Sequence, residues 1–237
     1  MRVGIIVALN TEAAPFAEAM KALKISPLTY PAERGGFEVK EWIMGPGVED
    51  LSIFMVVSGA GIISAAAATQ LLVDKYYVDK IINYGVVGCL KSDIPNCTVG
   101  YVKKVIKHDL DCRPFCRKFE YPGRENDGEW SPYEDAFDVE SLGIREFVCA
   151  SGDKVILAGD PKRELQKDTG ADICEMEAAS VMWVTKKAKI PVLIIKAVSD
   201  GVDEDEEAFQ SNIRNASKLC VKTIKKALNL PEPKNEE

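Results

Sequence analysis

Short runs of β-branched and other apolar residues recur along this chain, and stretches with helical periodicity separate them. The run VGIIVAL at 3–9 precedes a helical pattern at 13–23, and an alanine-rich stretch at 62–77 precedes the apolar run within 78–85. Unbroken apolar runs of this length are typical of strands that are buried on both faces. The alternation therefore predicts an α/β fold in which helices flank a central twisted sheet.

The chain contains neither a linker-like segment nor an internal repeat, so we expect one domain over residues 1–229 and a disordered tail at 230–237. Asn10 or Thr11 is suited to cap the first helix. Polar residues without periodicity predict a long loop at 117–135. The remaining patterns predict strands at 37–44, 51–58, 99–111, 145–157 and 191–200 and a final amphipathic helix at 209–228.

The charge balance and the cysteines limit the classes of partner and compartment. The net charge of −7 and a pI near 5.0 disfavour nucleic acid and anionic membrane surfaces as partners. No segment approaches the roughly 20 apolar residues that span a bilayer, and the N-terminal apolar run is too short for a signal peptide. The seven cysteines form no CxxC pair, which indicates free thiols in a reducing compartment. We therefore expect a cytoplasmic protein.

The sequence offers little support for a metal or cofactor site. Cys112, Cys116 and the single histidine, His108, lack a second pair of ligands, so we expect no metal and assign His108 a structural hydrogen bond. The glycine-bearing segments at 58–61 and 85–88 fit neither a Walker loop nor the spacing GxGxxG, and GxSxG is absent. We read both segments as turns and expect no cofactor.

Acidic residues stand where three of the expected elements begin or end. Glu12 follows the first strand, Glu175 and Glu177 flank a methionine at the start of an apolar helix, and Asp200 ends the strand at 191–200. Each one alone is ordinary as a solvated acid at a helix start or in a turn. Ligands of α/β sheets bind beyond the carboxyl ends of the strands, so together these acids predict an active site. Carboxylates there can bind sugar hydroxyls, polarise water and protonate a leaving group.

Two further segments are the most specific of the chain, EMEAAS at 175–180 and IIKAVSDG at 194–201. They occur in order with MRVGIIVALNTE, SGAGIISAAAATQLL, DKIINYGVVGCL, HDLD and SGD. With these segments the chain resembles, from residue 1 to about 225, the purine nucleoside phosphorylase/nucleosidase superfamily, and most of all its 5′-methylthioadenosine/S-adenosylhomocysteine nucleosidases. The resemblance implies one α/β domain around a mixed sheet, a homodimer, and hydrolysis of the N-glycosidic bond of a purine nucleoside. The expected substrates are methylthioadenosine, S-adenosylhomocysteine or both, with adenine as the product.

The resemblance also implies roles for the acidic residues. Glu12 corresponds to the glutamate that helps to activate the hydrolytic water, and Asp200 to the acid that protonates the purine at N7. Glu177 corresponds to the residue that binds the ribose 2′- and 3′-hydroxyls. Glu175 is expected to support Glu177, and Ser199 to orient Asp200.

A second group of residues is implied in binding the substrate. Met176 corresponds to a residue that packs against the sugar, and Val155 and Ile156 fall where the family holds the base. Phe115 corresponds to an aromatic residue that reaches the 5′ substituent across the dimer interface. Phe209 is expected to wall the same 5′ pocket.

Three features depart from the family's pattern. The segment at 85–88 carries Val86 and Val87 where the family has small or hydroxyl-bearing residues, and Val86 is expected beside the substrate. Val155 stands in place of an aromatic residue that stacks on the base, which removes stacking energy of about 0.5–1.5 kcal/mol. Lys196 stands in place of an arginine, and the two differ at a bidentate site. These departures bear on the identity of the substrate and leave the acids in place.

Two other functions remain open from the sequence. A phosphorylase of the same fold would use phosphate instead of water, but it needs cations for the dianion, and residues 10–23 contain no arginine. Arg34 of a neighbouring subunit could supply one. A nucleoside-binding or storage relative without catalysis is the second alternative, although storage requires none of Glu12, Glu177 and Asp200.

Overall fold

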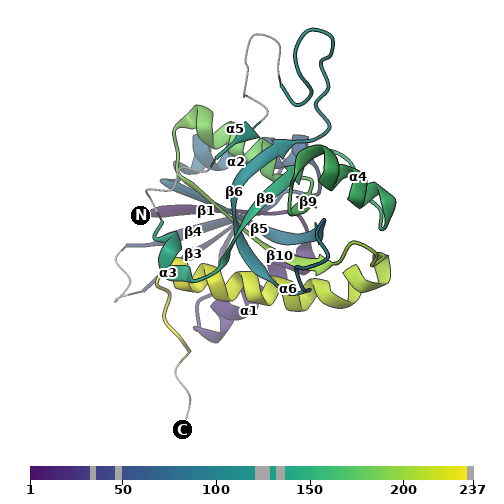
Figure 1. The fold of residues 1–237 in the computed structure, drawn as a ribbon. Coiled ribbons are helices and arrows are strands. Elements are labelled where there is room, and N and C mark those ends of the chain that lie inside the picture. The colour runs from purple at the N-terminus through teal and green to yellow at the C-terminus, as the bar shows by residue number, and fades with distance from the viewer. Residues whose placement is uncertain (33–35, 46–49, 121–128, 132–136, 234–237) are drawn as a thin grey trace.

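The computed structural model describes residues 1–32, 36–45, 50–120, 129–131 and 137–233 (Figure 1). The strands are β1 (Arg2–Val7), β2 (Leu28–Tyr30), β3 (Val39–Ile43), β4 (Ser52–Val57), β5 (Lys80–Cys89), β6 (Val99–Lys107), β7 (Glu129–Trp130), β8 (Arg145–Ser151), β9 (Ile173–Glu175) and β10 (Val192–Asp200). The helices are α1 (Asn10–Ala22), α2 (Ile62–Tyr76), α3 (Val139–Leu142), α4 (Asp160–Thr169), α5 (Ala178–Ala188) and α6 (Glu206–Ala227). None of these helices is long and apolar enough to cross a bilayer.

The strands form a mixed 10-stranded sheet, which confirms the predicted fold class. β1 lies between β4 and β5 and is parallel to both, and β5 is also parallel to β10. From β10 the pairing continues through β6, β8 and β9 and returns to β5, so this half of the sheet closes on itself. Because β1, β5 and β10 run in the same direction, their carboxyl ends meet at one edge.

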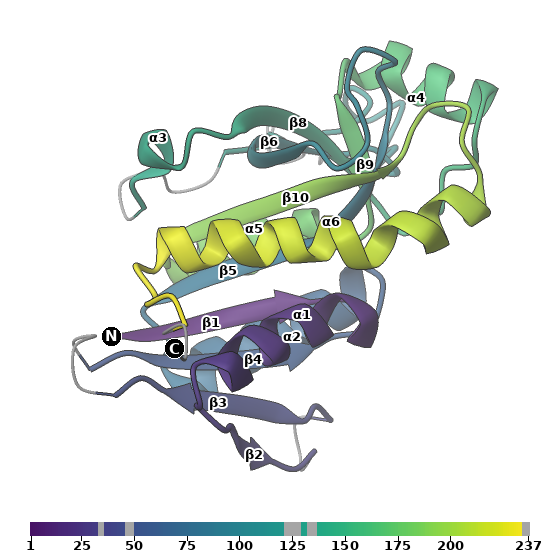
Figure 2. The same ribbon diagram turned by 90° about the horizontal axis from the view of Figure 1, so that it is seen from below.

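Helices cover both faces of the sheet (Figures 1 and 2). α2 and α5 lie on one face, where Leu72 and Val181 belong to a cluster of buried side chains. α1 and α6 lie on the other, where Phe16 and Ile224 belong to a second cluster. Burial on both faces explains why the central strands are apolar at nearly every position.

Residues 85–88 belong to strand β5, so the turn that we expected there is wrong. Val86 pairs with Ala197 and Val87 with Val198 of β10. β-Branched residues favour the extended backbone, and the strand therefore continues to Cys89. As a result, the backbone N–H of Val86 points toward the site described below.

The first helix is also capped differently from our expectation. Leu9, and neither Asn10 nor Thr11, occupies the N-cap position of α1. The backbone N–H of Leu9 donates to Glu12 Oε2 over 2.9 Å. Glu12 in the first turn instead accepts the N–H of the N-cap residue, which is the carboxylate half of a capping box.

The expected loop at 117–135 and the expected tail are only partly described. Trp130 lies in β7 rather than in a loop, and its buried ring contacts Trp183 edge to face. Residues 121–128 and 132–136 lie outside the described residues, as do 46–49, between the strands expected at 37–44 and 51–58. At the C-terminus, Leu230 is buried in the cluster beneath α6, and residues 234–237 lie outside the description.

Candidate active site

A cavity of about 700 Å³ opens where β1, β5, β9 and β10 end. Glu12, Glu177 and Asp200 line it, from three distant parts of the chain. The cavity therefore brings together the three acids that the sequence singled out. Its other predicted lining residues are Val86, Val155, Ile156, Glu175, Met176 and Phe209.

Glu12 is held by two backbone donors. Oε2 accepts the N–H of Leu9, and Oε1 accepts the N–H of Val86 over 2.8 Å. The residue is 3% exposed, and burial raises the pKa of its carboxyl, while the two N–H groups and Lys196 act in the opposite direction. A Cβ on Gly85 would lie 2.7 Å from Oε1, so this position of the carboxylate requires a glycine there.

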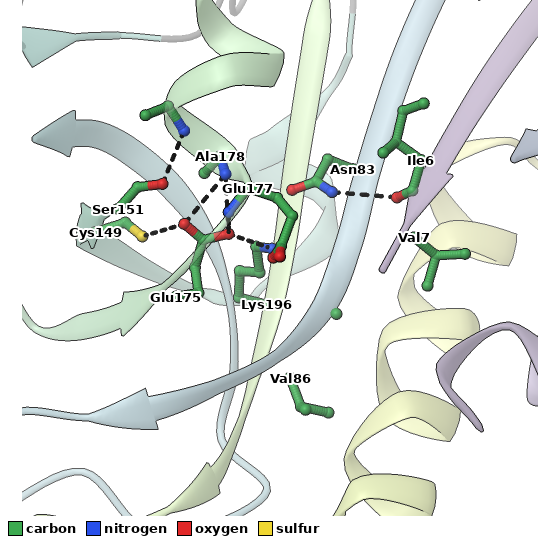
Figure 3. A network of polar contacts seen from close by, with 12 residues as sticks. Ile6, Val7, Asn83, Val86, Cys149, Ser151, Glu175, Glu177, Ala178 and Lys196 are labelled. Atoms are coloured by element: carbon green, nitrogen blue, oxygen red, sulfur yellow. Dashed lines mark hydrogen bonds and ion pairs between the residues drawn. The ribbon is translucent and has the colours of Figure 1, made fainter. Parts of the chain in front are cut away.

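Glu175 forms a buried ion pair with Lys196 (Figure 3). Its Oε2 lies 2.9 Å from Lys196 Nζ and also accepts the backbone N–H groups of Glu177 and Ala178. Burial alone would raise the pKa of Glu175, but Lys196 and the hydrogen bonds together lower it. The pKa of Lys196 is raised, because the charges of Glu175 and Glu177 outweigh burial. Glu175 is thus buried and ionised, and it accepts the N–H groups at the start of α5.

Glu177 stands at the N-cap position of α5 and faces the cavity. Its Oε1 accepts the N–H of Gly61 at the start of α2 over 2.8 Å. Within the described residues, no hydrogen bond reaches Oε2, which leaves this oxygen able to accept a hydroxyl. Burial, and then the charge of Glu175, raise the pKa of Glu177 to about 7.

Asp200 is held between a hydroxyl and an ammonium group at the end of β10. Ser199 Oγ donates to Oδ1 and Lys162 Nζ donates to Oδ2, both over 2.6 Å. Ser199 is fully buried, lies outside the cavity lining and contacts Asp200 from the side away from the cavity. Lys162 is 1% exposed and was missed from the sequence.

Two predicted contact residues are exposed in the single chain. Val155 lines the cavity and is 68% exposed, whereas Phe115 is 83% exposed and does not line it. The chain therefore leaves one side of the cavity without the aromatic residue that the resemblance implies. The structural hydrogen bond expected of His108 is absent at Nε2, which is buried without a partner among the described residues.

The described side chains suggest no place for a metal ion. No group of three or more histidine, cysteine, aspartate or glutamate side chains in this part of the chain is arranged as ligands. The acids of the cavity are instead bound to lysines and backbone N–H groups. Such a site can bind hydroxyl groups and exchange protons.

The pattern that defines the family described as Phosphorylase superfamily matches residues 2–229. The chain belongs to this superfamily. The 5′-methylthioadenosine/S-adenosylhomocysteine nucleosidase of Buchnera aphidicola is 29% identical in an alignment of 240 positions that covers 95% of this chain and 96% of that protein. The aminodeoxyfutalosine nucleosidase of Campylobacter jejuni is 24% identical in an alignment of 181 positions that covers 73% of this chain and 79% of that one.

A solved member shares the fold over nearly the whole chain. The structure of the 5′-methylthioadenosine/S-adenosylhomocysteine nucleosidase of Helicobacter pylori aligns with a TM-score of 0.85 at 22% identity. The alignment covers 97% of this chain and 98% of that one. The mixed sheet and its helices are therefore those of the superfamily.

The raised pKa of Glu177 predicts a pH-dependent stability. In the unfolded chain a glutamate loses its proton near pH 4.5, whereas folded Glu177 keeps it to about 7. Its contribution to stability is thus full below pH 4.5 and is lost as the pH rises to about 7. The free energy of unfolding is measured in urea at pH 5 and at pH 7.5. Between these two values it should fall by about 1–3 kcal/mol more in the wild type than in Glu177→Gln.

The exposed Glu164 on α4 provides the control for this measurement. Glu164→Gln should keep the pH dependence of the wild type. A Glu177→Gln protein whose stability falls as steeply as that of the wild type would show that Glu177 does not hold its proton in the folded state.

Proposed function

We propose that this protein hydrolyses the N-glycosidic bond of a purine nucleoside, namely 5′-methylthioadenosine, S-adenosylhomocysteine or both, and releases adenine. The observation that carries the proposal is the meeting of Glu12, Glu177 and Asp200 around one cavity. The Buchnera relative, which carries the name of this nucleosidase and matches 95% of the chain, supports the choice of substrate.

The geometry suits a division of labour among the acids. Glu177 Oε2 accepts the ribose hydroxyls, and Met176 packs against the sugar. Glu12 takes a proton from the water that attacks C1′, and burial, which raises its pKa, makes it a stronger proton acceptor than an exposed glutamate. Asp200 gives a proton to purine N7 while the C1′–N9 bond breaks through an oxocarbenium-like transition state.

The walls of the cavity suit the rest of a nucleoside. Val155 and Ile156 are positioned to hold the base, and Val86 lies beside the carboxylate of Glu12. Phe209, at the first turns of α6, is positioned to wall the 5′ pocket. Without an aromatic residue at 155, the base is held by apolar contact and the main chain.

The charge of the lining favours water over phosphate as the nucleophile. Glu204, Asp205 and Glu206 add to the acids already named, and the described lining contains no arginine and a single lysine, Lys154. Lys196 is bound to Glu175 and is not available to an anion. A phosphate dianion would be repelled from such a cavity.

Product analysis by chromatography tests the proposal. The purified protein is incubated with methylthioadenosine, S-adenosylhomocysteine, adenosine, inosine and aminodeoxyfutalosine, each with and without phosphate. Free adenine should appear from the first two substrates at the same rate in both conditions. Release of a base only with phosphate would establish a phosphorylase instead, and no release from any substrate would favour a binding protein.

Two variants complete this assay. Glu12→Gln and Asp200→Asn should each lower turnover by about 10²-fold or more, because each removes a proton-transfer group. Both should still bind methylthioadenosine, since the ribose contact of Glu177 is unchanged. Wild-type turnover in either variant would contradict the role given to that residue.

A homodimer is part of the proposal. Phe115, Leu157 and Ile63 are between 69% and 83% exposed, and such side chains are costly to leave in water. We place Phe115 of the partner subunit at the open side of the cavity, against the 5′ substituent. The seven free cysteines support a reducing compartment, and the cytoplasm is the proposed location.

Sedimentation at assay concentration, combined with kinetics, tests the dimer. The wild type should sediment as a dimer, and Phe115→Ala should raise KM for methylthioadenosine more than it lowers kcat, because it removes an apolar substrate contact. Full activity in a monomer would exclude a contribution from the partner.

A further inference from the structure

Lys162 is buried directly behind Asp200, where a charged side chain requires a compensating partner. Its side chain is 1% exposed, and Nζ donates to Asp200 Oδ2 over 2.6 Å and to the carbonyl oxygen of Gly201 over 2.5 Å. A buried ammonium group is strongly unfavourable unless it is paired. Lys162 is therefore fixed to the acid of the proposed reaction.

The surrounding backbone is shaped to admit this pair. A Cβ on Gly88 would lie 3.3 Å from Asp200 Oδ2 and 3.4 Å from Lys162 Cε. The N–H of Gly159, which caps α4, donates to the carbonyl oxygen of Val202, just beyond β10. The start of α4 is thus tied to the segment that carries Asp200, and Lys162 follows in its first turn.

The pairing raises a question about the proposed mechanism. An ammonium group that donates to a carboxylate stabilises the ionised form of the acid. Asp200 must nevertheless give a proton to the departing base. The carboxylate of Asp200 therefore requires a proton donor within hydrogen-bond distance.

We propose that Lys162 is a positioning residue that fixes Asp200 and stores the proton that Asp200 delivers; this inference rests on the proposed nucleosidase function. Lys162 passes one proton from Nζ to Oδ2 and becomes a neutral amine. Asp200 transfers a proton to purine N7 while the electron pair of the C1′–N9 bond moves to the base. The attacking water gives its hydroxyl to C1′ and its other proton to Glu12.

The charges balance over one turnover. The solvent returns one proton to Lys162, and Glu12 releases one proton to the solvent. Nucleoside and water have then become adenine and the free sugar, and both residues are in their starting states.

The other groups that face Lys162 do not compete for its proton. On β9, burial raises the pKa of Cys174 to about 12, and on β5 burial also raises the pKa of Cys89, so both thiols are neutral. Glu204, after β10, accepts the N–H of Gly201, and this hydrogen bond lowers its pKa. Among these titratable groups, Asp200 is the one that accepts a hydrogen bond from Lys162.

Steady-state kinetics on Lys162→Met and Lys162→Gln between pH 5 and pH 8 tests the inference. Glutamine keeps a hydrogen-bond donor but holds no ionisable proton. The glutamine variant keeps the test possible if the methionine variant does not fold. Both variants should lose kcat about 10²-fold at pH 8 with KM within roughly threefold of the wild type. The wild-type-to-variant ratio of kcat should shrink by about tenfold or more toward pH 5, because the higher proton concentration of the solvent then replaces the proton that Lys162 supplies in the wild type.

Lys91, which pairs with Asp172 outside the cavity, is the matched control. Lys91→Met should keep the kcat and pH profile of the wild type. A kcat ratio that is the same at every pH would mean that Lys162 only supports the structure, and the inference would be wrong. A wild type that releases no base would overturn the proposed function and this inference together, whereas an active wild type with unaffected Lys162 variants overturns the inference alone.

Discussion

The buried ion pair between Lys196 and Glu175 is the interaction on which the site depends. Glu175 receives the N–H groups that open α5, so the pair fixes the position of Glu177 as well. It also places a positive charge among three buried acids, and Lys196 lowers the pKa of Glu12 and of Glu177 relative to burial alone. Without it, Glu12, Glu175 and Glu177 would repel one another at positions where all three are buried.

The chain gives each acid a different task through its surroundings. Glu175 is ionised by Lys196 and the helix start, whereas burial raises the pKa of Glu12 above its usual range and raises that of Glu177 to about 7. Asp200 does not contact this pair and instead forms an ion pair with Lys162. The sheet makes this possible, because parallel strands deliver residues distant in sequence to one edge.

The sequence predicted the parts of this arrangement that local pattern controls. Apolar runs predicted β1 and β10, and the acids that follow them were found because strand ends are binding positions. The continuation of β5 through Val86 was missed, since it depends on pairing with β10. The partner of Lys196 was missed for the same reason, as β9 is only three residues long and is held by long-range pairing.

Lys162 was missed because α4 has no apolar stripe, and Lys162 is its one buried residue. The helix itself was also missed, although Pro161 in its first turn and the flanking Gly159 and Gly170 are signals that frame a short helix. They predict where the helix lies but not which side chain turns inward. That depends on the space beside Gly88 and on the charge of Asp200.

A double-mutant cycle on the ion pair tests the central claim most directly. The free energy of unfolding in urea is measured for the wild type, Lys196→Met, Glu175→Gln and the double variant. Each single change should cost about 3–5 kcal/mol, because it leaves a buried polar group unpaired, and the double variant should cost clearly less than their sum. Additive losses would contradict the claim that these two residues hold the site together through each other.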